Sequence, residues 1–152
     1  MKFYHVALCG LGLISAAGAA DMTIFYSPSC PHCHRARNFI RTELVYEYDD
    51  LAVTEVNAVL AENRGDFINA LQKCGYTKGG VPVIVIGDKC FQGYGENMND
   101  SIRAAVEVDY TDDQRNAAKT NREELNKDHD AFVAAHAARQ DAVVNKDEAK
   151  KN

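Results

Sequence analysis

Residues 27–33 (SPSCPHC) place two cysteines two residues apart, between a β-rich run and a stretch with helical spacing. The run 22–27 is rich in β-branched and aromatic side chains and is followed by Pro28, as is typical of a strand. Pro31 suits the first position of a helix that is capped by Cys30. The cysteine pair therefore lies where a strand passes into a helix, which restricts the fold more than any other feature of the chain.

The rest of the chain predicts alternating strands and helices. We expect a second strand over residues 44–50 and a helix over 54–74 that is interrupted at Gly65. A β-hairpin over residues 81–93 and a helix that ends near Val106 should follow. This order predicts an α/β domain with a central mixed sheet of four strands flanked by helices.

The first 20 residues have the pattern of a cleaved secretory signal. Lys2 precedes an apolar run over residues 6–20, which ends in small side chains and is short for a membrane span. A retained anchor is the alternative. We expect cleavage to remove residues 1–20 together with Cys9, and to leave a mature protein without stable membrane insertion. The predicted location is the periplasm or the outside of the cell, or the ER lumen in a eukaryote.

Four cysteines remain after residue 20, namely Cys30, Cys33, Cys74 and Cys90. An even number in an exported chain is compatible with two disulfides. We predict a structural disulfide between Cys74 and Cys90, which would join the end of the second helix to the hairpin. Two free buried thiols and a second redox pair are the alternatives.

The composition changes after Tyr110. Residues 111–152 are rich in Ala, Asp, Asn and Lys, and we expect a weakly amphipathic helix over residues 112–144. A solvated helical tail, a dimerisation or docking helix and a disordered segment remain open. The chain then divides into a signal peptide (1–20), an α/β domain (21–110) and a charged helical tail (111–152). With a formal net charge of −5 and no basic patch among aromatics, nucleic acid is not an expected partner.

The cysteine pair could be redox-active, metal-binding or structural. Thiol–disulfide exchange needs a thiolate and a second thiol close to it, and a helix N-terminus stabilises negative charge. Cys30 would be the exposed nucleophile and Cys33, three residues on, the shielded resolving thiol. His32 could place an imidazolium beside the Cys30 thiolate. A structural zinc site usually needs a second pair of ligands at short spacing, so we predict no metal.

Acidic and aromatic residues elsewhere in the sequence are further candidates for a role at the pair. A buried carboxylate beneath the resolving cysteine would help its deprotonation. Glu47, Asp49 and Asp50 end the predicted second strand, where a solvated strand end is the favoured interpretation. Phe91 and Tyr94 are expected in the core or a groove, without a chemical role.

The sequence IFYSPSCPHC, followed by a helix, resembles the active-site strand, turn and helix of the thioredoxin superfamily. Its Cys-Pro-His-Cys resembles the periplasmic disulfide oxidases of the DsbA type, whereas the size and element order are similar to glutaredoxin. Val81-Pro82, within GGVPVIVIGDKCFQGYGEN, stands where the superfamily has its cis-proline. The resemblance covers residues 22–108 and implies a thioredoxin-like fold of glutaredoxin size.

The resemblance also implies roles for a few residues. Cys30 matches the nucleophile and Cys33 the resolving thiol. Val81 and Pro82 match the loop that holds a substrate strand beside the sulfur, and Tyr26 could line the site or the core. The implied activity is that of an exported thiol–disulfide oxidoreductase, which exchanges disulfides with cysteine-containing protein substrates and with a redox partner protein.

Two alternative functions remain open. One is a glutathione- or reductase-driven disulfide reductase, and the other is a non-catalytic module that binds a partner or a metal. Residues 92–96 keep one glycine of the glutaredoxin glutathione site, and Ser-Pro-Ser replaces the basic residue that often precedes the first cysteine. We therefore expect no dedicated cofactor besides the redox-active disulfide, with glutathione as the candidate in doubt.

Overall fold

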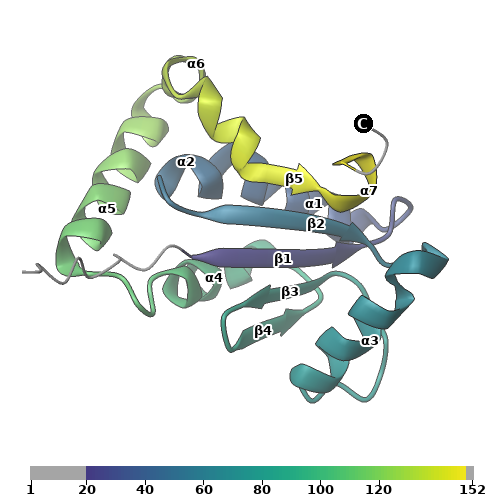
Figure 1. Cartoon of the computed structure of the whole chain (residues 1–152). Helices are drawn as coiled ribbons and strands as arrows, with labels where there is room; N and C mark the ends of the chain where they lie inside the picture. Colours follow the sequence, from purple (N-terminus) through teal and green to yellow (C-terminus); the bar gives the residue numbers. More distant parts are fainter. Residues whose placement is uncertain (1–19, 150–152) are drawn as a thin grey trace, which may run out of the picture.

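The computed structural model describes residues 20–149, which form a five-stranded mixed sheet with helices on both faces (Figure 1). The strand order is β4-β3-β1-β2-β5. β1 and β2 are parallel, as are β2 and β5, whereas β3 runs antiparallel to both β1 and β4. The strands are β1 (Asp21–Tyr26), β2 (Ala52–Asn57), β3 (Val83–Ile86), β4 (Lys89–Gln92) and β5 (Val143–Asn145).

The helices cover the sheet in two layers. α1 (Pro31–Phe39) continues through a π-helical segment, η1 (Ile40–Leu44), into α2 (Val45–Glu47), and packs with α4 (Asn99–Val106) on one face. α3 (Arg64–Lys73) covers the other face. The remaining helices are η2 (Ala61–Asn63), η3 (Glu96–Met98), α5 (Asp112–Lys127), α6 (His129–Ala135), η4 (Ala137–Ala142) and α7 (Lys146–Ala149).

The alternation of side chains along β1 divides the core in two. Met22 and Ile24 belong to the larger cluster, which includes residues of α1 and α4. Phe25 belongs to the smaller cluster under α3, where its ring centroid lies 5.5 Å from that of Phe67. Because successive strand residues point to opposite faces, β1 is buried on both sides. The carboxyl end of this central strand leads directly to the cysteine pair.

The predicted strand over residues 44–50 is wrong, because these residues continue the helix that begins at Pro31 and then turn. Residues 44–48 are buried without a break, and such a short run is compatible with a strand or with a helix because it shows no hydrophobic period. No proline or glycine separates this run from α1, so the helix continues to Glu47. The second strand is β2, which takes the start of the helix predicted over 54–74.

The prediction of four strands with a separate helical tail needs two corrections. β5 adds a fifth strand, and the helix expected over residues 112–144 is divided into α5, α6, η4 and β5. Asp128 interrupts the helix, and its side chain caps α6 by accepting a hydrogen bond from Ala131 N at 3.1 Å. Ala118 and Leu125 of α5 are buried in the larger core cluster. The segment therefore completes the sheet and its core.

Arg139 fastens this C-terminal segment to α2 and the turn after it. Its guanidinium donates to the carbonyl oxygens of Val45, Tyr48 and Leu51 at 2.8–2.9 Å. The three carbonyl groups belong to the turn in which the long helix ends and β2 begins. One arginine thus supplies the donors that this turn needs.

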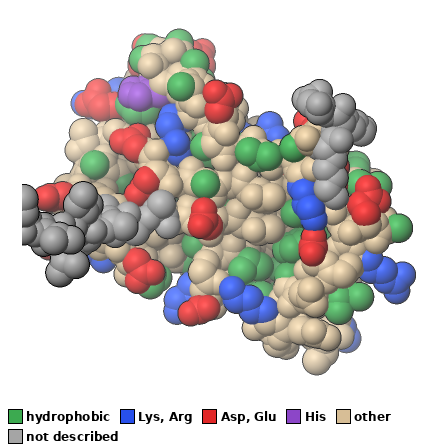
Figure 2. All heavy atoms as spheres, viewed as in Figure 1, with side chains coloured by type: hydrophobic (Ala, Val, Ile, Leu, Met, Phe, Trp, Pro, Cys, Tyr) green, Lys and Arg blue, Asp and Glu red, His purple; other side chains and the backbone are tan. Residues whose placement is uncertain are grey.

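The structure covers only part of what the sequence predicts about the N-terminus and the surface. The predicted signal peptide, with Cys9, lies outside the described residues except for Ala20. Within residues 20–149, every helix is too short or too polar to span a bilayer. On the face shown in Figure 2, acidic and basic side chains are interspersed.

Candidate active site

The cysteine pair forms the start of α1. Cys30 is the cap, with an extended backbone (φ −93°, ψ 113°), and Pro31 follows in the first turn. Cys30 Sγ accepts a hydrogen bond from the backbone N of Cys33 at 3.2 Å, and the two side chains form a disulfide with their Cα atoms 5.2 Å apart. Cys33 is fully buried, whereas Cys30 is partly exposed. The unpaired N–H groups of the helix end favour a negative charge at Cys30. The first turn carries no acidic residue that would oppose this charge.

The loop before β3 lies against this sulfur. The Val81–Pro82 peptide bond is cis, and the carbonyl oxygen of Val81 lies 3.7 Å from Cys30 Sγ. The carbonyl oxygen of Pro82 accepts a hydrogen bond from Gly93 N at 2.8 Å, which ties the loop to the segment after β4. The structure thus brings Val81 and Pro82 next to Cys30, and their role toward a substrate stays a prediction.

His32 is exposed and lies next to the pair, with its ring turned toward two other residues. Its Nδ1 lies 3.0 Å from the carbonyl oxygen of Tyr94 and 2.8 Å from Nη2 of Arg35. The polar groups against Cys30 Sγ come from Val81 and Cys33 instead. In the oxidised protein the polar contacts of the His32 ring are therefore with Tyr94 and Arg35, and its effect on the Cys30 thiolate stays a prediction.

Tyr26 belongs to the core beneath the site. It is buried, and its hydroxyl oxygen accepts a hydrogen bond from Asn145 Nδ2 at 2.9 Å. The guanidinium carbon of Arg37 lies 4.1 Å from the centroid of its ring, in a cation–π contact. Tyr26 therefore supports the end of β1, just before the loop that carries Cys30.

A buried carboxylate lies under α1, and it is Glu55 of β2. Arg37 and Arg41 donate hydrogen bonds to its two oxygens at 2.7–2.8 Å. Burial alone would raise the pKa of Glu55, but the hydrogen bonds from Arg41 and Arg37 outweigh it and hold the pKa below its ordinary value. A carboxylate held ionised in this way is a poor proton acceptor for Cys33. The spacing of the two arginines, four residues apart on one helix, is the sequence signal that could have indicated it.

The acidic residues considered from the sequence have structural partners. Glu47, only 1% exposed, accepts hydrogen bonds from Arg103 at 2.6 and 2.8 Å and from Arg122 at 2.9 Å. Asp49 and Asp50 accept hydrogen bonds from side chains of α5 and the residues before it, namely Asn121, Tyr110 and Gln114. The expected solvated strand end is thus wrong for Glu47, which anchors α4 and α5 to α2.

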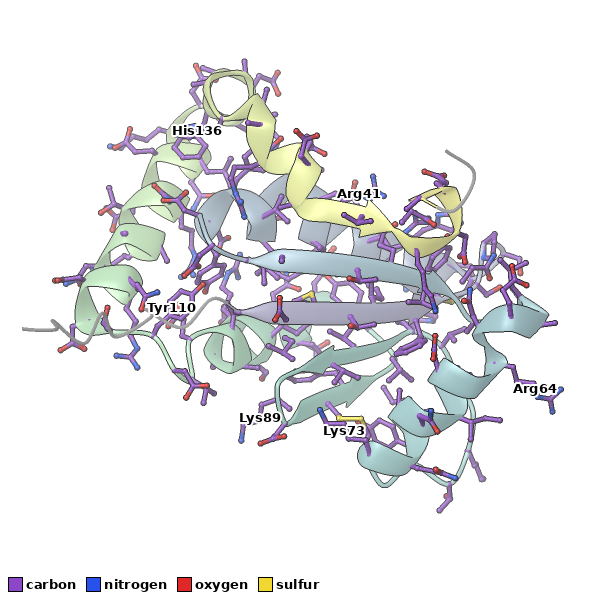
Figure 3. The ribbon with its side chains drawn as sticks, in the orientation of Figure 1. Arg41, Arg64, Lys73, Lys89, Tyr110 and His136 are labelled. Atoms are coloured by element: carbon purple, nitrogen blue, oxygen red, sulfur yellow. A yellow bond between two sulfur atoms is a disulfide. The ribbon has the colours of Figure 1, made fainter. Side chains whose placement is uncertain are left out.

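Cys74 and Cys90 form a second disulfide, with their Cα atoms 5.8 Å apart. It joins the end of α3 to β4, beside Lys73 in Figure 3. Lys73 Nζ also donates to the carbonyl oxygen of Gly87 at 2.8 Å, which connects α3 to the turn of the hairpin. Because the chain between the two cysteines contains Val81–Pro82, this disulfide closes a loop around the segment that faces Cys30.

The topology and the cysteine pair define the class of the domain. The order β1-α1-β2, then α3, the β3–β4 hairpin and α4, is that of a thioredoxin-like fold. The Cys30–Cys33 pair fits the Cys-x-x-Cys motif of a thioredoxin-superfamily domain. β5 and the helices after α4 are additions to that arrangement. Residues 20–149 contain no group of three or more His, Cys, Asp or Glu side chains placed to hold a metal ion.

Comparisons with known proteins give two similar solved structures. One is a glutaredoxin from Archaeoglobus fulgidus, 29% identical, with a TM-score of 0.43 and a match over 57% of this chain and 88% of that protein. The other is a candidate thioredoxin from Neisseria meningitidis, 18% identical, with a TM-score of 0.37 and a match over 58% of this chain and 75% of that protein. No protein-family model and no curated protein matches the chain. The class of the domain therefore rests on its own strand order and cysteine placement.

Proposed function

We propose that this protein is an exported thiol–disulfide oxidoreductase that exchanges disulfides with cysteines of protein substrates. The observation that carries the proposal is the partly exposed Cys30 at the cap of α1, with the fully buried Cys33 joined to it. A helix N-terminus favours the thiolate that such exchange needs. The second disulfide, Cys74–Cys90, supports an oxidising compartment, because disulfides persist in exported proteins and are rare in reducing ones.

The exposure of the two sulfurs decides where exchange begins. With the protein oxidised, a substrate thiolate attacks Cys30 Sγ and forms a mixed disulfide, while the bond to Cys33 breaks. The electron pair of that bond stays on the Cys33 sulfur, which takes a proton. A second substrate thiolate then attacks the substrate sulfur of the mixed disulfide, and Cys30 leaves as a thiolate. Two electrons pass from the substrate dithiol to the protein, and the reverse sequence reduces a substrate disulfide.

Val81 is the group best placed to hold the substrate main chain during this exchange. It is partly exposed, and its carbonyl oxygen lies 3.7 Å from Cys30 Sγ. An extended peptide that hydrogen-bonds to the backbone of Val81 would bring its own cysteine to Cys30. Chain-like substrates fit this arrangement because the recognition uses main-chain groups, which every polypeptide offers.

Insulin reduction and trapping of mixed disulfides test the proposal. Cys30→Ser should abolish exchange, whereas Cys33→Ser should accumulate mixed disulfides because the resolving thiol is gone. Reduced protein should be alkylated at Cys30 first at mildly acidic pH. The double variant Cys74→Ser/Cys90→Ser is the matched control and should keep exchange. Exchange by Cys30→Ser, or first labelling of Cys33, would contradict the assignment.

The same assay separates the alternatives. Turnover that needs glutathione would favour the glutathione-driven reductase. Capture of a protein partner without any turnover would favour a binding module. Fractionation of the source cells tests export independently, since the mature protein should appear outside the cytosol.

A further inference from the structure

Two groups with opposite hydrogen-bonding character lie against one ring nitrogen of His32. The carbonyl oxygen of Tyr94, which only accepts, is 3.0 Å from Nδ1, and Nη2 of Arg35, which only donates, is 2.8 Å from it. A neutral imidazole carries its proton on one nitrogen. If Nδ1 is unprotonated, Arg35 donates to it and Nε2 carries the proton. If Nδ1 is protonated, the ring donates to Tyr94 and Arg35 loses its acceptor.

We propose that Arg35 is a positioning residue that fixes neutral His32 as the tautomer protonated at Nε2. Arg35 makes the shorter of the two contacts, and a hydrogen bond from a charged donor is stronger than one between neutral groups. The two residues are three positions apart on α1, so their side chains are neighbours on one helix face. With Nδ1 accepting from Arg35, that nitrogen is not available as a base beside the cysteine pair.

Arg35 is the charged hydrogen-bond donor at His32 Nδ1. Arg35 lines a groove of about 640 Å³, and the other charged and titratable residues that line it are His34 of α1, Glu43 of η1, and Tyr94 and Glu96 after β4. His34 is engaged elsewhere, because its Nε2 lies 2.7 Å from the carbonyl oxygen of Pro28. Of the described residues that line the groove, Arg35 alone carries a permanent positive charge.

This assignment changes the source of charge at the site. The sequence suggested an imidazolium at His32 as the group that favours the Cys30 thiolate. With Nδ1 accepting from Arg35, the guanidinium and the helix end supply that charge instead. A guanidinium stays protonated across the pH range in which proteins fold, so this contribution does not titrate. The consequence for thiol chemistry rests on the proposed function, whereas the tautomer does not.

Long-range proton–nitrogen NMR correlations of the His32 ring test the tautomer in the oxidised full-length protein, at a pH where the ring is neutral. We expect the proton on Nε2 in the parent protein and on Nδ1 in Arg35→Met, where Tyr94 is left as the partner. Arg115→Met, which removes the same charge from α5 at the opposite end of the sheet, should leave the tautomer unchanged (Figure 1). A proton on Nδ1 in the parent, or the same tautomer in parent and Arg35→Met, would overturn the proposal.

Equilibration with glutathione tests the consequence. Arg35→Met should make the disulfide a weaker oxidant, with an equilibrium constant changed by up to about fivefold, the upper end for an exposed charge. Arg115→Met should match the parent, and an unchanged constant in Arg35→Met would overturn the electrostatic role. If neither variant nor parent exchanges with glutathione or with insulin, the proposed function fails, and the NMR result still decides the role of Arg35.

Discussion

Removal of the Cys74–Cys90 disulfide should destabilise the protein more than removal of the disulfide at the helix start. The Cys74–Cys90 bridge joins residues 16 apart in sequence, whereas the Cys30–Cys33 bridge joins residues 3 apart. In the chain-entropy account a bridge stabilises by restricting the unfolded chain, and the effect grows with loop length. At 25 °C these loops correspond to about 3 and about 2 kcal/mol. Both Cys74 and Cys90 are half-buried, so their replacement by serine should add little cost from lost packing.

Urea unfolding of the oxidised proteins measures this difference. Cys74→Ser/Cys90→Ser should lose about 3 kcal/mol in the free energy of unfolding, and its Tm should fall by roughly 10 °C. The dependence on urea should steepen, because an unbridged unfolded chain exposes more surface. Cys30→Ser/Cys33→Ala is the comparison, since it removes the bridge from a much shorter loop without placing a hydroxyl at the fully buried Cys33.

Two results would refute this reasoning. Equal losses in the two double variants would show that loop length does not set the stabilisation. Free thiols at Cys74 and Cys90, found by alkylation and mass spectrometry of the non-reduced protein, would remove the bridge itself.

Three further predictions concern the supports of the site. Glu55→Gln should cost about 3 kcal/mol at pH 7, because two arginines lose their buried partner. Because the folded pKa of Glu55 lies below 4.5, its contribution is complete above that pH and is lost as the pH falls through the folded pKa. The variant should therefore lose less stability in acid, and equal acid slopes in urea titrations would contradict this. Arg139→Met should cost about 2–3 kcal/mol by thermal unfolding, since three carbonyl groups lose their donor; a change within about 0.5 kcal/mol would show that water replaces it. Deletion of residues 137–152 should expose the edge of β2 and promote self-association in size-exclusion chromatography, whereas a monomer with the parent Tm would show that β5 is dispensable.

Elements marked by local signals could be predicted from the sequence. β1 ends just before Pro28 and α1 begins at Pro31, and each proline acts on its own neighbours. The predicted hairpin over residues 81–93 matches β3 and β4, because the turn at Gly87 has the positive φ of 53° that glycine accepts. The run 44–50 lacked such a signal, since residues 44–48 are all buried and show no hydrophobic period.

Of the candidate site, the parts that are adjacent in sequence could be predicted, and the parts assembled by folding could not. The cysteine pair is a contiguous motif, and the hairpin pattern marks the position of Val81-Pro82. Tyr94, in contrast, lies 62 residues from His32 and contacts it through a backbone carbonyl group, which any residue would offer. Glu55 fell within the helix predicted over residues 54–74, and its role could not be predicted because it depends on arginines that come from another element.

The pairing of β5 with β2 has a consequence for the order in which the protein folds during synthesis. Asn145, which follows the cysteine motif by more than a hundred positions, reaches back to Tyr26 across 119 residues. Contacts between residues so distant in sequence close large loops and form late. A nascent chain can therefore place Cys30 and Cys33 on a helix end while β2 is still an unpaired edge. Cys30 and Cys33 would then lie at the start of a formed helix before β5 is made, and β2 would stay the edge of the sheet until residues 143–145 emerge.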